Sequence, residues 1–329
     1  MAAQQPTLLE AIRGSVSADL AAVDATIRRE LTSDVALVNQ VAEYIIGAGG
    51  KRLRPLLVLL AARAAGARPL AAQVPAAVVI EFIHTATLLH DDVVDGSHQR
   101  RGRNTANEVW GNAASVLVGD FLYSRAFQMM VRLDSLRVCD IMADATNTIA
   151  EGEVLQLMNA NDPDTTESRY LDVIYRKTAR LFESGAQIAA VLAGADPATE
   201  RALARYGRHL GNAFQLVDDA LDYQGSASVR GKNVGDDLAE GKPTLPLIHA
   251  LRHGNAEQQA LLRRAVENGG LGELPAVLHA IESAGGLEYT ARLARGEADL
   301  ALAALEPLPD TVHTEALRQL ASFAISRAY

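Results

Sequence analysis

Residues 78–95 read VVIEFIHTATLLHDDVVD, and this stretch is the most informative part of the sequence for the fold. Its first part is apolar almost all round, which predicts a buried helix inside a helical protein. The helix ends in three carboxylates, those of Asp91, Asp92 and Asp95. Residues four apart share a helical face, so Asp91 and Asp95 point the same way while Asp92 lies about 100° around. Buried carboxylates at a helix C-terminus, where the macrodipole disfavours negative charge, need a counter-charge that a divalent cation would supply.

A second stretch repeats this arrangement. Residues 210–222 read LGNAFQLVDDALD, which predicts an apolar helix that ends with Asp218 and Asp222 on one face. Mg²⁺ prefers one or two protein carboxylates, several waters and the phosphate oxygens of a substrate. Two such helices that face each other therefore predict a Mg²⁺ site for a diphosphate. One motif alone could merely cap a helix with solvated charge, but two copies make that interpretation the weaker one.

Basic residues near the motifs predict contacts with phosphate. Lys51 and Arg54 follow a glycine break at a helix start, where free backbone amides suit an anion. Arg100 and Arg101 follow the first aspartate motif, and the guanidinium group of arginine matches phosphate oxygens in two-point contacts. The bland alternative for each pair is a solvated basic turn on the surface.

Other polar residues gather around the same motifs. His84 is seven residues before Asp91 and shares its helical face, although a lone histidine on an apolar helix is more often a satisfied core residue. The glycine-rich stretch of about residues 224–242 is typical of a lid, and its lysines could close over a diphosphate. The further candidates are Lys177, Thr178, Gln215, Lys232 and Lys242.

The rest of the chain predicts helices throughout. Alanine and leucine are abundant, and apolar residues recur at three and four positions rather than alternating. No run with period two and no hairpin signal predicts a strand. We expect helices at 7–31, 34–47, 53–66, 74–95, 112–132, 136–159, 167–193, 198–223, 243–253, 256–268, 272–284, 287–306 and 311–327. Since the breaks between them are short, we expect one all-α domain over residues 1–329.

Bulk properties exclude several classes of protein. The net charge of −9 gives no attraction for nucleic acid, and no basic run offsets it. The lone Cys139 can make no internal disulfide and suits no zinc site, so a reducing cytoplasm fits best. The N-terminus does not resemble a signal peptide, and no apolar run approaches the roughly 20 residues of a membrane helix. We therefore expect a cytoplasmic protein with at most peripheral membrane contact.

Together these motifs resemble those of the trans-polyprenyl diphosphate synthases. The match covers Gly-Gly-Lys-x-x-Arg-Pro at 49–55, Asp-Asp-x-x-Asp-x-x-x-x-Arg-Arg-Gly at 91–102, Lys-Thr at 177–178 and Phe-Gln-x-x-Asp-Asp-x-x-Asp at 214–222. Within that family, the pattern is most similar to the bacterial octaprenyl diphosphate synthases of ubiquinone biosynthesis. The resemblance implies an all-α helical bundle around a deep central cavity, usually as a homodimer. The implied reaction is the Mg²⁺-dependent, repeated condensation of isopentenyl diphosphate onto an allylic diphosphate such as farnesyl diphosphate.

The resemblance also implies roles for single residues. The isopentenyl diphosphate would be held by Lys51, Arg54, His84 and Arg101. The allylic diphosphate would be held by Arg100, Lys177, Thr178, Gln215, Lys232 and Lys242. The direct ligands of Mg²⁺ would be Asp91, Asp95 and Asp218, with Asp92 and Asp222 in support. The catalytic set would be Asp91, Asp95, Lys177 and Asp218.

Product length is implied by the residue five positions before the first aspartate. That residue is Ala86, followed by Thr87, and both are small, so we expect a tunnel past them and a long-chain product. The resemblance favours eight isoprene units, while solanesyl, decaprenyl and shorter products stay open. Residues 151–156, EGEVLQ, depart from the Gly-Gln-x-x-Asp pattern of short-chain relatives, which also favours a long chain. The tunnel floor would come from a bulky residue such as Phe127, Met129 or Met130, and the sequence does not choose among them.

Three other functions stay open at this point. A shorter-chain synthase would use the same residues. A class I terpene cyclase also uses an aspartate motif and Mg²⁺, but the basic residues at 51–54 and 100–101 would then have no second diphosphate to bind. A non-catalytic subunit of a heteromeric synthase tends to lose metal ligands, whereas both motifs are intact here.

Overall fold

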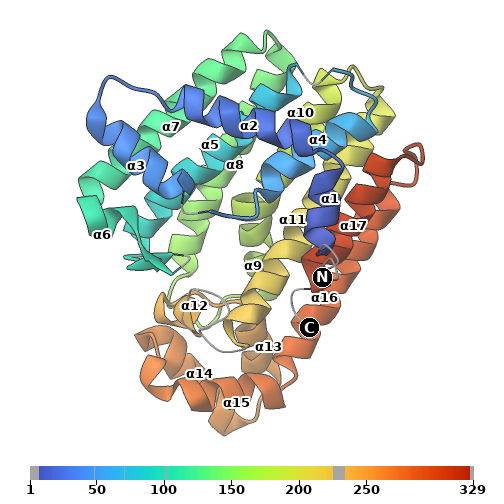
Figure 1. Cartoon of the computed structure of the whole chain (residues 1–329). Coiled ribbons are helices and arrows are strands. Elements are labelled where there is room, and N and C mark those ends of the chain that lie inside the picture. The colour runs from blue at the N-terminus through green and yellow to red at the C-terminus, as the bar shows by residue number, and fades with distance from the viewer. Residues whose placement is uncertain (1–6, 48, 70, 101, 225–233, 327–329) are drawn as a thin grey trace, which may run out of the picture.

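Nearly the whole chain folds into packed helices (Figure 1). The computed structural model describes residues 7–47, 49–69, 71–100, 102–224 and 234–326. The α-helices are α1 (Leu8–Gly14), α2 (Ser17–Glu30), α3 (Ala36–Gly47), α4 (Leu53–Ala64), α5 (Gln73–Val94), α6 (Ala106–Trp110), α7 (Asn112–Arg132), α8 (Leu136–Asn159), α9 (Glu167–Ile174), α10 (Arg180–Leu192), α11 (Pro197–Asp222), α12 (Asp236–Ala239), α13 (Leu245–His253), α14 (Ala256–Asn268), α15 (Leu274–Ser283), α16 (Gly286–Ala304) and α17 (Val312–Ser326). The all-α fold class expected from the sequence is confirmed.

Helix α5 runs through the middle of the bundle and carries the first aspartate motif at its end. Helices α2, α4, α7 and α10 pack against it. Every residue from Ala76 to Ile83 is buried, as the all-round apolar sequence predicts. The last turn is more exposed than the rest apart from the buried Asp92, and the backbone amide of Asp95 donates to the carbonyl of Asp91. The carboxylates of this motif are therefore held at the C-terminal end of a buried helix.

Helix α11 carries the second aspartate motif and packs between α10 and α16. Two glycines of α11 allow this helix to approach α10 and the residue directly before α10 closely. A Cβ atom on Gly207 would lie 2.5 Å from the carbonyl oxygen of Phe182, and one on Gly211 would lie 2.5 Å from the Cα atom of Ala179. Both distances are too short for any side chain, so only glycine permits this packing. The packing sets the second motif beside the residues that precede α10.

The lower end of the molecule in Figure 1 is a group of short helices, α12 to α15, with a small core of their own. Leu238 of α12 is fully buried in this core, together with Tyr223, Leu247 and Leu262. Burial of Leu238 holds α12 next to the end of α11, so this group positions the polar residues that follow α12. No helix among the described residues is long and apolar enough to cross a membrane.

The structure departs from the sequence-based expectation in local details. The expected helix at 7–31 is broken, because the Ser15 hydroxyl donates to the carbonyl of Ile12 and ends α1. The expected helix at 167–193 contains a π-helical turn, η1 (Tyr175–Ala179), between α9 and α10. A short antiparallel hairpin of β1 (Gln99–Arg100) and β2 (Arg103–Asn104) follows the first motif, where no strand was expected. Its four residues are too few to show a period-two pattern.

Candidate active site

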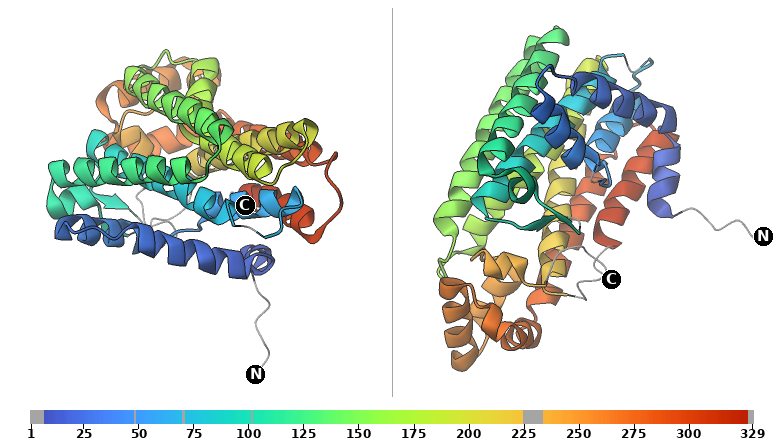
Figure 2. Two further views of the ribbon diagram at one scale, coloured as in Figure 1. Left: turned by 90° about the horizontal axis from the view of Figure 1, so that it is seen from above. Right: turned by 60° about the vertical axis from the view of Figure 1, so that its left-hand side comes forward.

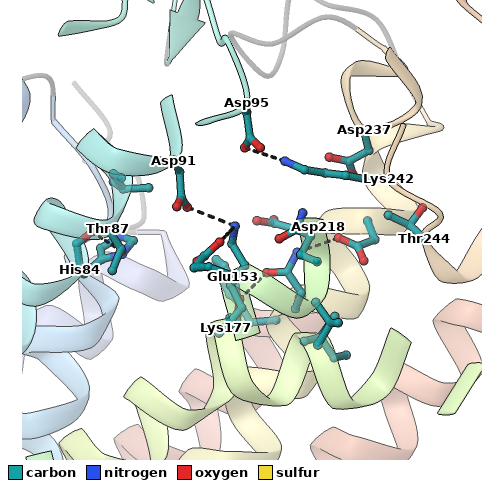
Figure 3. Close-up of a pocket in the computed structure, with 18 of the residues that line it drawn as sticks. His84, Thr87, Asp91, Asp95, Glu153, Lys177, Asp218, Asp237, Lys242 and Thr244 are labelled. Atoms are coloured by element: carbon teal, nitrogen blue, oxygen red, sulfur yellow. Dashed lines mark hydrogen bonds and ion pairs between the residues drawn. The ribbon is translucent and has the colours of Figure 1, made fainter. Parts of the chain in front are cut away.

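The two aspartate motifs face each other across a cavity of about 760 Å³. Figure 3 shows Asp91 and Asp95 on one side and Asp218 and Asp237 on the other. The wall also includes residues from the start of α4, from α8 and from η1. Helices that are far apart in sequence thus bring the two predicted motifs to one site.

The three carboxylates of the first motif have different partners. Asp91 forms an ion pair with the Lys177 ammonium at 3.2 Å, and Asp95 forms one with Lys242 at 2.6 Å. Asp92 is fully buried and points away, where it accepts from Arg100 at 2.6 Å and 2.9 Å. The helical geometry predicted this split, because Asp91 and Asp95 share a face that Asp92 does not. Only the outer two of the three carboxylates therefore line the cavity.

Each of the two lysines bridges two carboxylates. Lys177 also contacts Glu153 at 2.5 Å, and Lys242 also contacts Glu240 at 2.6 Å. Burial lowers the pKa of Lys242, but the charges of Glu240 and Asp95 outweigh burial and hold that pKa above its usual value. Both ammonium groups thus carry charge at neutral pH and lie beside the aspartates of the first motif.

Glu153 is a carboxylate that the sequence-based site did not include. Burial, followed by the negative charge of Asp91, raises the pKa of Glu153 to about 7, although Lys177 acts in the opposite direction. Its second oxygen, Oε1, is buried without a hydrogen-bond partner. Neighbouring Gly152 places it here, since a Cβ on that glycine would lie 2.9 Å from the backbone nitrogen of Lys177. Helix α8 and η1 can therefore touch along their backbones.

Two carboxylates of the second motif line the cavity, those of Asp218 and Asp219, whereas the third, Asp222, does not. Asp219 accepts from the Tyr170 hydroxyl at 2.5 Å and from the Gln215 amide at 2.7 Å. Burial, then the nearby Asp237, raises the pKa of Asp219 against the effect of these two donors. Asp222 is buried and accepts from the backbone amide of Asp237 at 3.1 Å, which holds the start of α12.

The predicted basic loop contributes to the wall of the same cavity. Lys51, Arg54 and His84 all line it, and a guanidinium nitrogen of Arg54 lies 2.9 Å from Nε2 of His84. The Arg54 guanidinium also lies over the Phe182 ring, 4.6 Å from its centroid. Sequence reasoning missed Arg52, which has a left-handed φ of 46° and pairs with Glu81 of α5. This pair fastens the loop to α5 and turns its neighbours toward the cavity.

Thr178 and Gln215 form a hydrogen-bonded pair on the cavity wall. The Thr178 hydroxyl donates to Oε1 of Gln215 at 2.9 Å. Thr178 follows Lys177 on the π turn η1, and such turns occur often at functional sites. Two other predicted ligands, Arg101 and Lys232, lie outside the described residues.

The two residues expected to set product length differ in position. Thr87 lines the cavity, whereas Ala86 is fully buried within the bundle and is not part of the cavity wall. Of the three candidates for the tunnel floor, Met129 and Met130 are buried and Phe127 is exposed at the surface. The tunnel itself stays a prediction.

The cavity suits a hard divalent cation that is completed by its substrate. Within the described ranges, no three His, Cys, Asp or Glu side chains already converge as one ligand set. The donors that do line the cavity are carboxylate oxygens, including the unpartnered Oε1 of Glu153. Because Mg²⁺ takes few protein carboxylates and fills its shell with water and phosphate oxygens, opposed motifs with a gap between them fit it.

Comparisons with known proteins agree over almost the full length. A family model described as polyprenyl synthetase matches residues 35–281. The octaprenyl diphosphate synthase of Escherichia coli (strain K12) is 58% identical over 320 residues, which cover 97% of this chain and 99% of that protein. The all-trans-nonaprenyl-diphosphate synthase (geranyl-diphosphate specific) of Rhodobacter capsulatus is 48% identical, with coverage of 96% and 97%. The crystal structure of a polyprenyl synthase from Caulobacter crescentus CB15, complexed with calcium and isoprenyl diphosphate, has a TM-score of 0.94, 46% identity and 98% coverage of both chains.

Proposed function

The chain belongs to the polyprenyl synthetase family, and we propose that it is a long-chain trans-polyprenyl diphosphate synthase with an octaprenyl product. It is a prenyltransferase, and the resemblance inferred from its motifs is confirmed. Two different sets of residues that suit diphosphate line one cavity, and this supports the proposal: the aspartate motifs with Lys177 and Lys242, called the acidic end, and Lys51, Arg54 and His84, called the basic end. A cyclase would need only the acidic end.

The acidic end would bind the allylic diphosphate together with Mg²⁺. Asp91, Asp95 and Asp218 would hold the cation, which supplies positive charge against the diphosphate as it leaves. Lys177 and Lys242 already lie against the first motif, and a diphosphate would be a new partner for their ammonium groups. Since both stay charged when buried, they would stabilise the negative charge of the leaving group.

The remaining polar residues of the acidic end would act less directly. Arg100 would reach the allylic diphosphate while held by Asp92, so Asp92 supports the site without binding metal. Thr178 and Gln215 would contact the same substrate as an oriented pair. Lys232 would join them from the glycine-rich segment.

The basic end would bind isopentenyl diphosphate without metal. Lys51, Arg54, His84 and Arg101 would hold this diphosphate, and arginine suits it because its planar fork matches phosphate oxygens. Apolar side chains complete the cavity wall between the ends: Leu53, Leu88, Val173, Ile174 and Phe214. These would exclude water from the allylic cation, whose charge is attacked by the double bond of isopentenyl diphosphate. The proton lost afterwards would pass to the released diphosphate.

Chain length would depend on the small side chain of Ala86. We expect Ala86→Phe to shorten the dominant product by several isoprene units, since a ring at this buried position of α5, next to Thr87 on the cavity wall, would obstruct the proposed tunnel. Chromatography of the dephosphorylated products would measure this. Ala86→Ser, which is close to alanine in size, should leave product length unchanged. An unchanged length in Ala86→Phe would refute the proposed tunnel.

We also propose that the chain works as a homodimer. Eight large apolar side chains are exposed on α7 and α8, which lie on one side of the molecule (Figure 2): Val116, Leu117, Phe127, Val131, Leu136, Val154, Leu157 and Met158. Apolar surfaces of this kind mark protein interfaces. Light scattering of the purified protein tests the proposal, and a mass equal to one chain would contradict it.

An elongation assay tests the proposed function as a whole. The purified chain, Mg²⁺, farnesyl diphosphate and labelled isopentenyl diphosphate should give a product of eight isoprene units. Absence of any elongation would contradict the synthase and favour a non-catalytic subunit, and a cyclic hydrocarbon would favour a cyclase.

A product of eight units would suit the side chain of ubiquinone. The lone thiol of Cys139 suits synthesis in a reducing cytoplasm.

A further inference from the structure

A chain of three side-chain hydrogen bonds begins at a tyrosine that no aspartate or basic motif contains. The Tyr170 hydroxyl donates to Oδ2 of Asp219, the Gln215 amide donates to Oδ1 of Asp219, and the Thr178 hydroxyl donates to Oε1 of Gln215. We propose that Tyr170 is a positioning residue of the transfer reaction, which sets the orientation of the Gln215 amide through Asp219. The proposal rests on the proposed function, because Gln215 and Thr178 matter only if an allylic substrate binds beside them.

The pattern of donors and acceptors explains how Tyr170 would act at a distance. Its hydroxyl occupies one carboxylate oxygen of Asp219, so the other oxygen is turned toward Gln215. That oxygen accepts, and the nitrogen end of the Gln215 amide faces it. A reversed amide would set two acceptor oxygens against each other. The Oε1 end of Gln215 is therefore directed to Thr178.

Thr178 is the end of the chain that reaches the substrate. Its single hydroxyl hydrogen is committed to Gln215, so its remaining capacity toward the cavity is as an acceptor. A reversed Gln215 amide would instead donate to Thr178 and free the hydroxyl hydrogen. The polarity that this wall presents to the allylic substrate thus depends on which way the amide lies.

Packing fixes Tyr170 well enough for this role. Its side chain is only 5% exposed and lies in a cluster with Ile174, Leu216, Val217 and Ile248. Tyr170 belongs to α9, directly before the π turn that carries Thr178, whereas Asp219 and Gln215 belong to α11. The hydrogen bond therefore joins the two elements whose relative position sets this wall of the cavity.

Tyr170→Phe tests the proposal because it removes only the hydroxyl and keeps the ring in the core. We expect kcat for elongation to fall about tenfold, in line with the loss of a hydrogen bond to a carboxylate. The KM for isopentenyl diphosphate should change by no more than about twofold. This substrate would bind to Lys51 and Arg54, and neither of them takes part in the hydrogen bonds of Tyr170 and Asp219. Tyr175→Phe is the matched control, because its hydroxyl bonds Glu183 outside the cavity wall, and its kcat should equal that of the wild type.

A double variant separates positioning from a merely structural role. If Tyr170 acts through Gln215, Tyr170→Phe should cause no further loss of kcat in a Gln215→Leu background. Losses that multiply, or a Tyr170→Phe enzyme with the kcat of the wild type, would overturn the proposal.

Should Tyr170→Phe fold poorly, Asp219→Asn tests the same chain of hydrogen bonds, because the amide of an asparagine can bond either end of the Gln215 amide. We expect a similar loss of kcat, and wild-type kcat would overturn the proposal. A wild-type protein that makes no elongated product would overturn the proposed function as well, and this is seen before any variant is compared.

Discussion

Asp91→Asn is expected to lower kcat for elongation by about a thousandfold, the scale on which loss of charge stabilisation at a leaving group slows enzymes. Asp91 contacts the Lys177 ammonium and lines the cavity beside Glu153. The substitution keeps the size of the side chain and removes its charge, so a cation between the motifs would lose a ligand and Lys177 would lose a partner. Steady-state incorporation of labelled isopentenyl diphosphate at saturating Mg²⁺ measures the effect.

The control for Asp91→Asn is Asp24→Asn on the exposed face of α2, which should retain full activity. The half-saturating Mg²⁺ concentration should also rise in Asp91→Asn, whereas the KM for isopentenyl diphosphate should change little. A variant with near wild-type kcat and an unchanged need for Mg²⁺ would mean that the first motif does not hold the metal.

Arg54→Gln is expected to raise the KM for isopentenyl diphosphate by about a hundredfold, since a partly buried arginine that meets a phosphate contributes two charge-assisted bonds. Arg54 is held over Phe182 and against His84, so its guanidinium is fixed before substrate arrives. Affinity for the allylic substrate should change little, because that substrate would bind near the other end of the cavity. Initial rates at varied concentrations of each substrate separate the two effects.

Arg54→Lys refines the test, because it keeps the charge but loses the planar fork. We expect a KM between those of the wild type and Arg54→Gln. Arg28→Gln, at an exposed position of α2, should behave as the wild type. If Arg54→Gln instead raised the KM of the allylic substrate, Arg54 would bind the allylic diphosphate, and the proposed assignment of the two substrates would be wrong.

Most of the fold could be predicted because its long helices have strong periodic patterns. The bounds of α7, α8 and α14 agree with the expected ranges to the residue, since glycine, proline and polar residues flank their apolar runs. The π turn η1 was not predictable from periodicity, and it lies in close contact with Gly152 on another helix. The hairpin after α5 was missed for a similar reason, since short strands depend on their partner more than on their own sequence.

The site could be predicted mainly where its residues form, or lie close to, a local motif. The two aspartate motifs and the basic loop are short stretches, and the structure brings all three to one cavity. Glu153 and Tyr170 carry no such signal, because what makes them notable is a partner on a different helix, Lys177 for one and Asp219 for the other. The sequence shows that residues 151–156 depart from the pattern of short-chain relatives. Only the contact with Lys177 in the structure shows that Glu153 belongs to the site.

Calorimetric titration of each substrate, with and without Mg²⁺, distinguishes the two proposed diphosphate sites. One diphosphate should bind through metal at the aspartate motifs and the other through basic side chains alone. A non-reactive allylic diphosphate analogue should bind in Mg²⁺ and lose nearly all measurable binding in excess chelator. Isopentenyl diphosphate should bind with similar affinity in both conditions. Equal dependence of the two ligands on Mg²⁺, or binding of the allylic analogue without metal, would contradict the account.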